Sequence, residues 1–122
     1  MTTLLVIGRI ILGGFFIYSG VNHFRGFGMM TQYAKMKGVP FPATAQGAAG
    51  VMLLLGGSSI LFGLYPFVGI LLLVAFLIPV SLMMHNFWTI KDPQAKMADK
   101  VNFMKNMALL GALLMLLAAP TP

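Results

Sequence analysis

The stretch PFVGILLLVAFLIPVSLMM, residues Pro66–Met84, decides the fold of this chain because it carries no charged side chain along its whole length. A helix needs roughly 20 apolar residues to cross the hydrocarbon core of a bilayer. Pro66 suits the first turn of a helix, whereas Pro79 should kink the helix and leave one carbonyl without its usual partner. The stretch therefore predicts a helix that spans a membrane.

Three further apolar runs of similar length occur in the chain, and only Arg9 and Lys105 place a charge inside one. Hydrophobic residues make up 59% of the 122 residues and charged residues only 8%, which leaves too little polar surface for a soluble protein of this size. We expect an all-α polytopic membrane protein, a four-transmembrane-helix bundle. It should form a single domain, 1–122, with spans at about 4–22, 43–64, 66–84 and 101–119.

The basic residues predict how this bundle lies in its membrane. Two long loops, 23–42 and 85–100, separate the spans, and a very short turn at Tyr65 joins the middle two. Every lysine and arginine except Arg9 lies in or beside these loops. The positive-inside rule then places both loops in the cytoplasm and both termini outside. The N-terminus lacks the basic region and cleavage site of a signal peptide, so we expect the first span to remain in the mature protein.

Composition also narrows the chemistry. The absence of cysteine removes disulfides, thiol redox relays and thiolate metal sites. The net charge of +6 comes from single residues beside apolar runs, which suits anionic lipid headgroups better than nucleic acid. There is no glutamate, no Ser-His-Asp order and no phosphate-binding loop, so we expect no catalytic residues and no catalysis by this chain alone. The two histidines have no evident third metal ligand, so no metal site is expected; haem between them is an alternative.

Polar residues gather where three of the predicted spans meet the long loops. Asn102, Lys105 and Asn106 follow the i, i+3, i+4 spacing of one helix face. Asn22 and His23 close the first span, and His85 closes the third, with Trp88 just beyond it. If the bundle closes, these residues meet at one depth as a polar mouth. They then either hydrogen-bond neighbouring helices together or form a ligand or proton site, and the residues leave both readings open.

Arg9 is the costliest residue in the first span, because a charge inside a membrane needs a partner or a path to the interface. At 100° per residue it shares a stripe with Gly13, Phe16, Gly20 and His23, and we expect this stripe to face the bundle. Arg9 then either anchors an anionic or carbonyl group of a ligand, or snorkels outward and caps helix carbonyls.

Small residues predict where the helices approach one another closely. The first two spans are rich in glycine and serine, and the pairs Ser59-xxx-Gly63 and Ala108-xxx-Ala112 have the spacing of close helix contacts. Trp88, Phe87 and Tyr65 lie at span ends, which is typical of an aromatic belt at the membrane surface.

Four segments together resemble the DoxX family of small four-helix bacterial membrane proteins. In order, they are IGRIILGGFFIYSGVNHF (7–24), GVPFP (38–42), MMHNFW (83–88) and NFMKNMALLGALLML (102–116). The resemblance implies a four-span bundle in the bacterial inner membrane. The recurring positions of the family correspond to Gly8, Arg9, Gly20, Pro40, Pro42, His85, Lys105 and Asn106. The position of His23 is often lysine in relatives, so a haem that uses His23 would not be a family trait.

The family takes its name from a subunit of an archaeal thiosulfate:quinone oxidoreductase. The resemblance therefore implies an accessory or quinone-facing subunit of a membrane redox assembly, with quinone as its one ligand and no other cofactor evident. The candidate ligand-binding residues are Arg9, His85, Trp88, Lys105 and Asn106, and the polar mouth adds Asn22, His23 and Asn102. The alternatives are a small-molecule or lipid-binding carrier and a purely structural subunit. The expected partners are the lipid bilayer and subunits of a membrane complex, while a homo-oligomer is left open.

Overall fold

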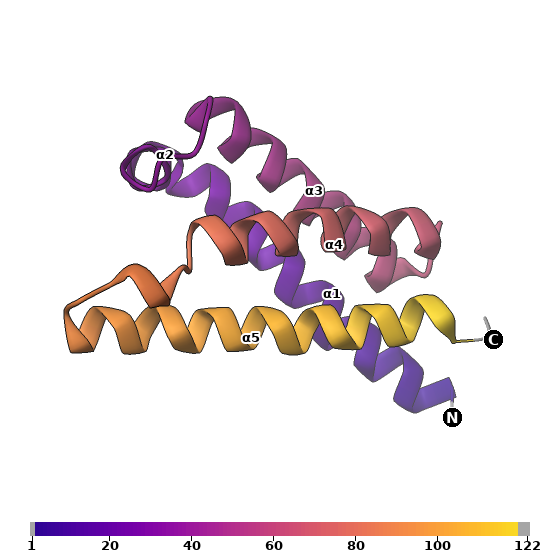
Figure 1. The fold of residues 1–122 in the computed structure, drawn as a ribbon. Helices are drawn as coiled ribbons and strands as arrows, with labels where there is room; N and C mark the ends of the chain where they lie inside the picture. The colour runs from indigo at the N-terminus through magenta and orange to yellow at the C-terminus, as the bar shows by residue number, and fades with distance from the viewer. Residues whose placement is uncertain (1, 120–122) are drawn as a thin grey trace.

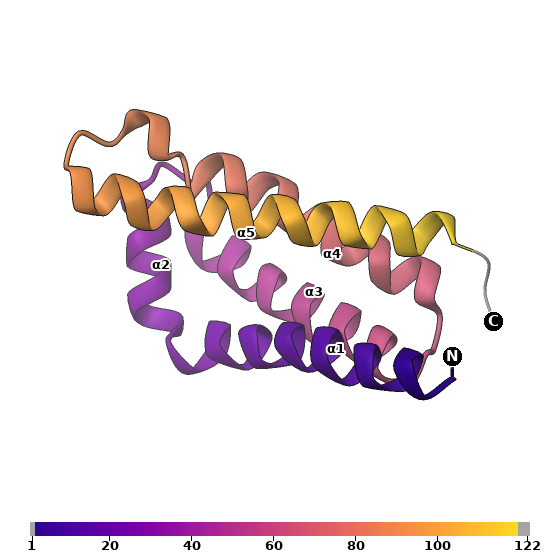
Figure 2. The same cartoon turned by 90° about the horizontal axis from the view of Figure 1, so that it is seen from below.

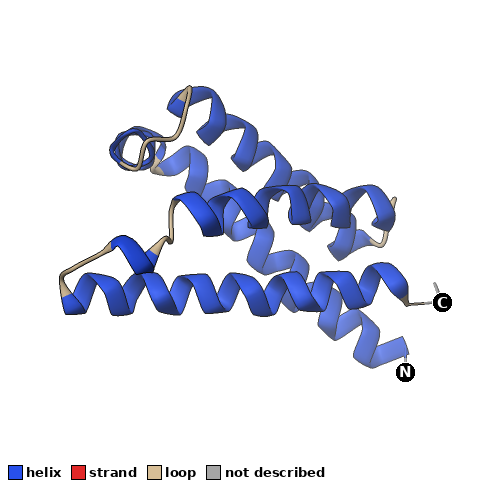
Figure 3. Ribbon diagram, viewed as in Figure 1, coloured by secondary structure: helices blue, strands red, loops and turns tan. Residues whose placement is uncertain are grey.

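Helices make up almost all of the described chain, residues 2–119, and no strand occurs among those residues (Figure 3). In the computed structural model, the elements in chain order are α1 (Thr2–Arg25), α2 (Phe27–Met36), α3 (Pro42–Phe62), α4 (Pro66–Met83), the short 3₁₀ helix η1 (Phe87–Thr89) and α5 (Pro93–Ala118). Within the described chain, α1, α3, α4 and α5 are long and apolar enough to cross a membrane. The predicted all-α membrane fold is confirmed.

The four long helices form a curved row rather than a closed bundle. Helix α3 packs against both α1 and α4, and α4 packs against α5 (Figures 1 and 2). The backbones of α1 and α5, at the two ends of this row, do not come into contact. Helix α2 is seen end-on in Figure 1 and lies across the ends of the long helices in Figure 2. Side chains, rather than closely spaced backbones, therefore connect α1 with α5.

Both long connections lie at one end of the molecule. Helix α2 and the segment between α4 and α5 meet there, while the start of α1 and the end of α5 lie at the opposite end (Figure 1). We call the end with the two long connections, residues 26–41 and 84–92, the loop end. The opposite end, which includes the α3–α4 turn at 63–65, is the turn end. This layout agrees with an even number of spans. The side of the membrane that each end faces stays a prediction.

Two stretches that the sequence analysis treats as loop are helical in the structure. Segment 23–42 contains α2, and α5 begins at Pro93, well before the expected start near 101. Asp92 explains the earlier start, because its Oδ2 accepts a hydrogen bond from the backbone N–H of Ala95 at 2.9 Å. An aspartate cap followed by proline in the first turn is a strong helix start. The hydropathy pattern does not indicate this earlier start, because the first turns of α5 are polar.

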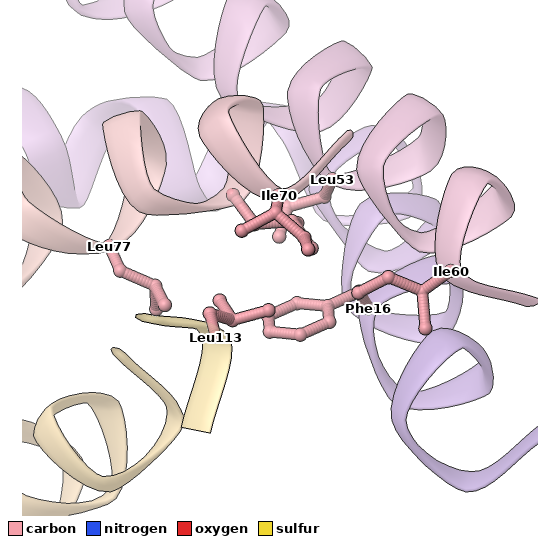
Figure 4. Packing of buried hydrophobic residues seen from close by; sticks show 7 residues of the cluster. Phe16, Leu53, Ile60, Ile70, Leu77 and Leu113 are labelled. Atoms are coloured by element: carbon pink, nitrogen blue, oxygen red, sulfur yellow. The ribbon is translucent and has the colours of Figure 1, made fainter. Parts of the chain in front are cut away.

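A small apolar core joins all four long helices (Figure 4). Leu73 of α4 and Leu113 of α5 are fully buried, at 0% exposure, and Phe16 of α1 lies in the same cluster. The cluster also includes Leu53, Ile60, Ile70 and Leu77. Only 11% of the apolar window of α5 is buried within the chain, so the rest of that helix presents its side chains outward. Lipid is the solvent that such a surface requires.

Glycines allow α1 and α3 to approach closely. A Cβ on Gly13 would lie 2.8 Å from the carbonyl oxygen of Gly57, and a Cβ on Gly57 would lie 2.9 Å from that of Gly13. Both residues are buried, as are Phe16 and Gly20 on the same face of α1. The predicted inward stripe on the first span is confirmed from Gly13 to Gly20. On α5, Ala108 and Ala112 are both exposed, so their spacing does not mark a contact within the chain.

The turn between α3 and α4 is held by one buried serine. The hydroxyl of Ser59 donates to the carbonyl oxygens of Leu64 and Tyr65, the latter at 3.1 Å. Gly63 ends α3 with a φ of 68°, and Tyr65 adopts a φ of 49° directly before Pro66. A left-handed backbone is strained at a tyrosine. The two hydrogen bonds from Ser59 help to keep the turn in this shape.

Candidate functional site

A cavity of about 570 Å³ lies among the helices next to the loop end. Side chains from α1, α2, α3, α4 and α5 line it, and most of them are apolar or aromatic. Phe15 of α1 and Lys105 of α5 are exposed residues that border the cavity. Met29 and Tyr33 of α2 also line the cavity and are exposed, so the cavity reaches the protein surface beside these residues. Its volume falls within the roughly 300–1,000 Å³ typical of small-molecule sites.

One set of polar side chains reaches the cavity from α1 and α3. His23 lines the cavity, and its Nδ1 lies 2.9 Å from the backbone oxygen of Ser19, so Nδ1 carries the proton of this hydrogen bond. Gln46, which is 7% exposed, donates through Nε2 to the backbone oxygen of His23 at 3.3 Å. The ring of His23 also meets Phe76 of α4 edge-on, with 5.7 Å between ring centroids. The histidine is therefore held in one orientation.

A second polar set reaches the cavity from the other side, on α4 and α5. His85, Lys105 and Asn106 all line it. Asn106 is only 5% exposed, and its side chain makes no hydrogen bond within residues 2–119. The Lys105 ammonium lies 5.6 Å from the centroid of the Phe15 ring, so this contact spans the gap between α5 and α1. These groups provide hydrogen-bond donors beside an otherwise apolar space.

An ionic network lies at the loop end and adjoins the cavity through His85. Lys37, just after α2, donates through Nζ to Oδ1 of Asn86 at 2.9 Å and to Oδ2 of Asp99 at 3.3 Å. The other oxygen of Asp99 lies 3.3 Å from Nδ1 of His85. The carboxylate is 8% exposed and is thus shared by a lysine and a histidine in a mostly buried position. Lys37 ties the α2 side of the bundle to α4 and α5.

The structure brings together four of the eight residues that the sequence selects. His23, His85, Lys105 and Asn106 all line the cavity. His23 comes from α1, His85 from the segment after α4, and Lys105 and Asn106 from one turn of α5. Their meeting therefore follows from the packing of these helices. The predicted polar mouth thus has a counterpart in the structure, although its binding role stays a prediction.

The other four candidates lie outside the cavity lining. Arg9 is near the turn end, where its Nη1 would lie 3.0 Å from a Cβ on Gly63. Asn22 and Asn102 are half-buried and do not line the cavity. Trp88 is 51% exposed and also lies outside the lining. The single site that included Arg9 is therefore divided between the two ends of the bundle.

Trp88 belongs to an aromatic cluster at the loop end. Its ring lies 5.3 Å from that of Phe87 and 5.5 Å from that of Phe103, measured between centroids, in edge-to-face arrangements. The Nζ of Lys100 lies 5.9 Å from the centroid of Phe87. Exposed aromatic rings beside lysines are typical of the headgroup level of a membrane. This placement supports the predicted aromatic belt over a ligand contact for Trp88.

Sequence reasoning missed Asp99, Lys37 and Gln46. Asp99 was placed in a loop, whereas it lies in the second turn of α5 and is buried. The Asp92–Pro93 pair is the signal that could have found it, because a helix that starts there carries Asp99 toward the bundle. Gln46 stands out as a polar side chain in an apolar run. The partners of Lys37 lie far away in the sequence, so no local pattern reveals them.

The described residues contain no group of three or more His, Asp or Glu side chains that could hold a metal ion.

Comparison with known proteins places the chain in a family without adding a function. The DoxX family model matches residues 4–86, which cover α1 to the end of α4 and stop before α5. No curated protein and no solved structure matches the chain significantly.

Proposed function

The chain belongs to the DoxX family and is a multi-pass membrane protein, and we propose that it holds one amphipathic molecule of the bilayer in its cavity. The polar headgroup of this molecule would lie beside His85, Lys105 and Asn106, and its apolar part would lie among the side chains of α1, α3 and α4. The chain would bind this molecule without transforming it.

The observation that carries the proposal is a mainly apolar cavity that contains a few polar side chains and reaches the surface beside exposed lining residues. An empty apolar cavity is costly because its walls lose packing contacts. A ligand with an apolar body restores those contacts, and its headgroup can use the donors of Lys105 and the buried amide of Asn106. Exposed lining residues such as Phe15 and Met29 would let such a ligand enter from lipid.

Extraction of the purified protein tests this proposal. The protein is isolated in mild detergent, and bound small molecules are identified by mass spectrometry. We expect a specific amphiphile at close to one molecule per chain. Ala49→Phe, which places a ring in the cavity, should lower that amount at least several-fold. Ala112→Phe, a matched change at an exposed site outside the lining, should leave it unchanged.

Two results would contradict this assignment. A wild-type protein that yields only bulk lipid, in the proportions of the membrane, would show that the cavity selects nothing. Equal amounts of bound amphiphile in Ala49→Phe and Ala112→Phe would place the binding site elsewhere.

A quinone is the second candidate for the occupant, and the donor-rich wall of α5 favours it. The carbonyl oxygens of a quinone accept hydrogen bonds, which the ammonium of Lys105 and the amide of Asn106 can donate. The protein would then be an accessory or quinone-facing subunit of a redox assembly, with the electron transfer carried by partner subunits. The ultraviolet spectrum of the extract decides this, because a bound quinone absorbs there and changes on reduction. An extract without quinone would contradict the redox role.

Orientation is a further part of the proposal. The loop end and the helix turns beside it carry exposed basic side chains, namely those of Arg25, Lys35, Lys91, Lys96 and Lys100. The positive-inside rule places such an end in the cytoplasm of a bacterial inner membrane. A reporter fused after α5 should therefore be active only as a periplasmic reporter. Activity of a cytoplasmic reporter at the same point would reverse the orientation.

A further inference from the structure

The charges around the cavity are all of one sign. Among the described residues that line it, Lys105 is positive, His23 and His85 are basic, and no aspartate or glutamate is present. The two acidic residues of the chain are engaged elsewhere: Asp99 binds Lys37 and His85, and Asp92 caps the start of α5. Asp99 therefore partners His85, while Lys105 has no acidic partner among the described residues.

Lys105 occupies an unfavourable position for a charge without an acidic partner. It is an exposed residue at the cavity border and lies six residues beyond Asp99, about 9 Å further along the apolar part of α5 at ~1.5 Å per residue. The ion pairs within residues 2–119 involve only Lys37, His85 and Asp99, so Lys105 has the ring of Phe15 as its neighbour and no carboxylate. A cation at this depth is stabilised strongly by an anion. The site thus favours a ligand that brings a negative charge.

Asn106 is an independent indication that a polar ligand group belongs here. The residue is 5% exposed and lines the cavity, and its side chain makes no hydrogen bond among residues 2–119. Among those residues, only Oγ1 of Thr31 is both unpaired and fully inaccessible, so the amide of Asn106 keeps some accessible surface that a polar ligand group can reach. The amide of Asn106 and the ammonium of Lys105, on consecutive residues, provide donors from one turn of α5. An ionised carboxylate, which only accepts hydrogen bonds, matches such donors.

We propose that the cavity selects a single-chain carboxylate amphiphile, with its carboxylate on Lys105 and Asn106 and its chain beside Phe16, Leu53 and Leu77. This rests on the proposed function, in which the cavity holds an amphiphile, and adds the charge of its headgroup. The cavity volume of about 570 Å³ suits one chain rather than a two-chain phospholipid. The carboxylate completes an ion pair in a membrane environment, where a neutral headgroup of the same size would leave Lys105 unpaired.

Two probes that differ only in headgroup test this inference. Hexadecanoate and hexadecanol have the same chain length, and their affinities are measured on the purified full-length protein in mild detergent. We expect wild type to bind hexadecanoate at least ten times more tightly than hexadecanol. Lys105→Met keeps the length of the side chain and removes the charge, so the preference should fall to about one. Lys105→Arg should retain it.

Lys91→Met is the matched control, because Lys91 is an exposed lysine that does not line the cavity. It should keep the full preference for hexadecanoate. A Lys91→Met protein that loses the preference would overturn the assignment to Lys105 and indicate a general surface-charge effect. If Lys105→Met does not fold, the ratio of the wild-type affinities for hexadecanoate and hexadecanol alone decides whether the cavity selects a carboxylate.

The remaining outcomes separate the inference from the proposed function. Equal binding of hexadecanoate and hexadecanol by wild type would overturn carboxylate selection while leaving the cavity as an amphiphile site. Binding of neither probe, together with no co-purified amphiphile, would overturn both. Nanodiscs that contain phosphatidylglycerol should compete with hexadecanoate no better than nanodiscs of phosphatidylcholine; stronger competition would assign the site to a phospholipid headgroup and overturn the single-chain ligand.

Discussion

Lys37 and Asp99 are 62 residues apart in the sequence and form an ion pair with 3.3 Å between Nζ and Oδ2. The pair joins the end of α2 to the second turn of α5, two elements whose backbones are not in contact. On the far side of the cavity, Lys105 and Phe15 make the corresponding contact between α5 and α1. Two lysines therefore connect α5 with helices whose backbones do not contact it.

Asp99→Asn should destabilise the protein, because it leaves Lys37 and His85 around a neutral group in a mostly buried position. We expect the free energy of unfolding in mixed detergent micelles to fall by about 1–3 kcal/mol, below the cost of breaking a fully buried pair since Lys37 and His85 are partly exposed. Asp92→Asn is the control: asparagine caps helices as well as aspartate, so stability should change by less than about 0.5 kcal/mol. Equal losses in both variants would contradict a structural role for the Lys37–Asp99 pair.

The same substitution should loosen α2, whose side chains line the cavity at Met30 and Tyr33. The chain has no cysteine, so Met30→Cys gives a single labelling site. In the Asp99→Asn background, a water-soluble maleimide should modify that cysteine several-fold faster than in the wild-type background. An unchanged rate would show that packing on α3, rather than the ion pair, holds α2 in place.

Neighbouring glycines in α1 should respond in opposite directions to alanine. Gly13→Ala places a Cβ against the backbone of α3 and should cost about 1–3 kcal/mol through overpacking. Gly14→Ala meets no atom within 4 Å and should be neutral or stabilise the helix by up to about 1 kcal/mol. Unfolding in mixed micelles measures both. Similar values for the two variants would show that α1 and α3 are not packed at Gly13.

Ser59→Ala should destabilise the α3–α4 turn, because it removes the hydroxyl that donates to two turn carbonyls. We expect a loss of about 1–3 kcal/mol. Ser58→Ala changes the adjacent serine, whose side chain makes no hydrogen bond within the described chain, and should shift stability by less than about 0.5 kcal/mol. A Ser59→Ala protein as stable as wild type would mean that Gly63 and Pro66 suffice to form the turn.

Asn106→Leu should separate ligand binding from helix packing. Removal of an amide that makes no hydrogen bond within residues 2–119 should change the stability of the empty protein by no more than about 1 kcal/mol, while the bound amphiphile falls several-fold. Asn102→Leu and Arg9→Leu, both outside the cavity lining, should retain the amphiphile. A large loss of stability in Asn106→Leu with unchanged binding would identify Asn106 as a link between helices rather than a ligand contact.

The sequence alone determined that this chain is an all-α membrane protein with four long apolar helices, since the required length and apolar character of a span are local properties. It also selected His23, His85, Lys105 and Asn106, because polar side chains are conspicuous at the ends of apolar runs. Tertiary structure decided which of the polar residues share a site. Arg9 lies at the turn end, away from the cavity. Asp99 lies beside the cavity because it contacts Lys37, just after α2, and His85, in the segment after α4. The separation of the α1 and α5 backbones depends on the order in which the helices pack. This order is set by contacts such as that of Gly13 with Gly57, which pair residues far apart in the chain.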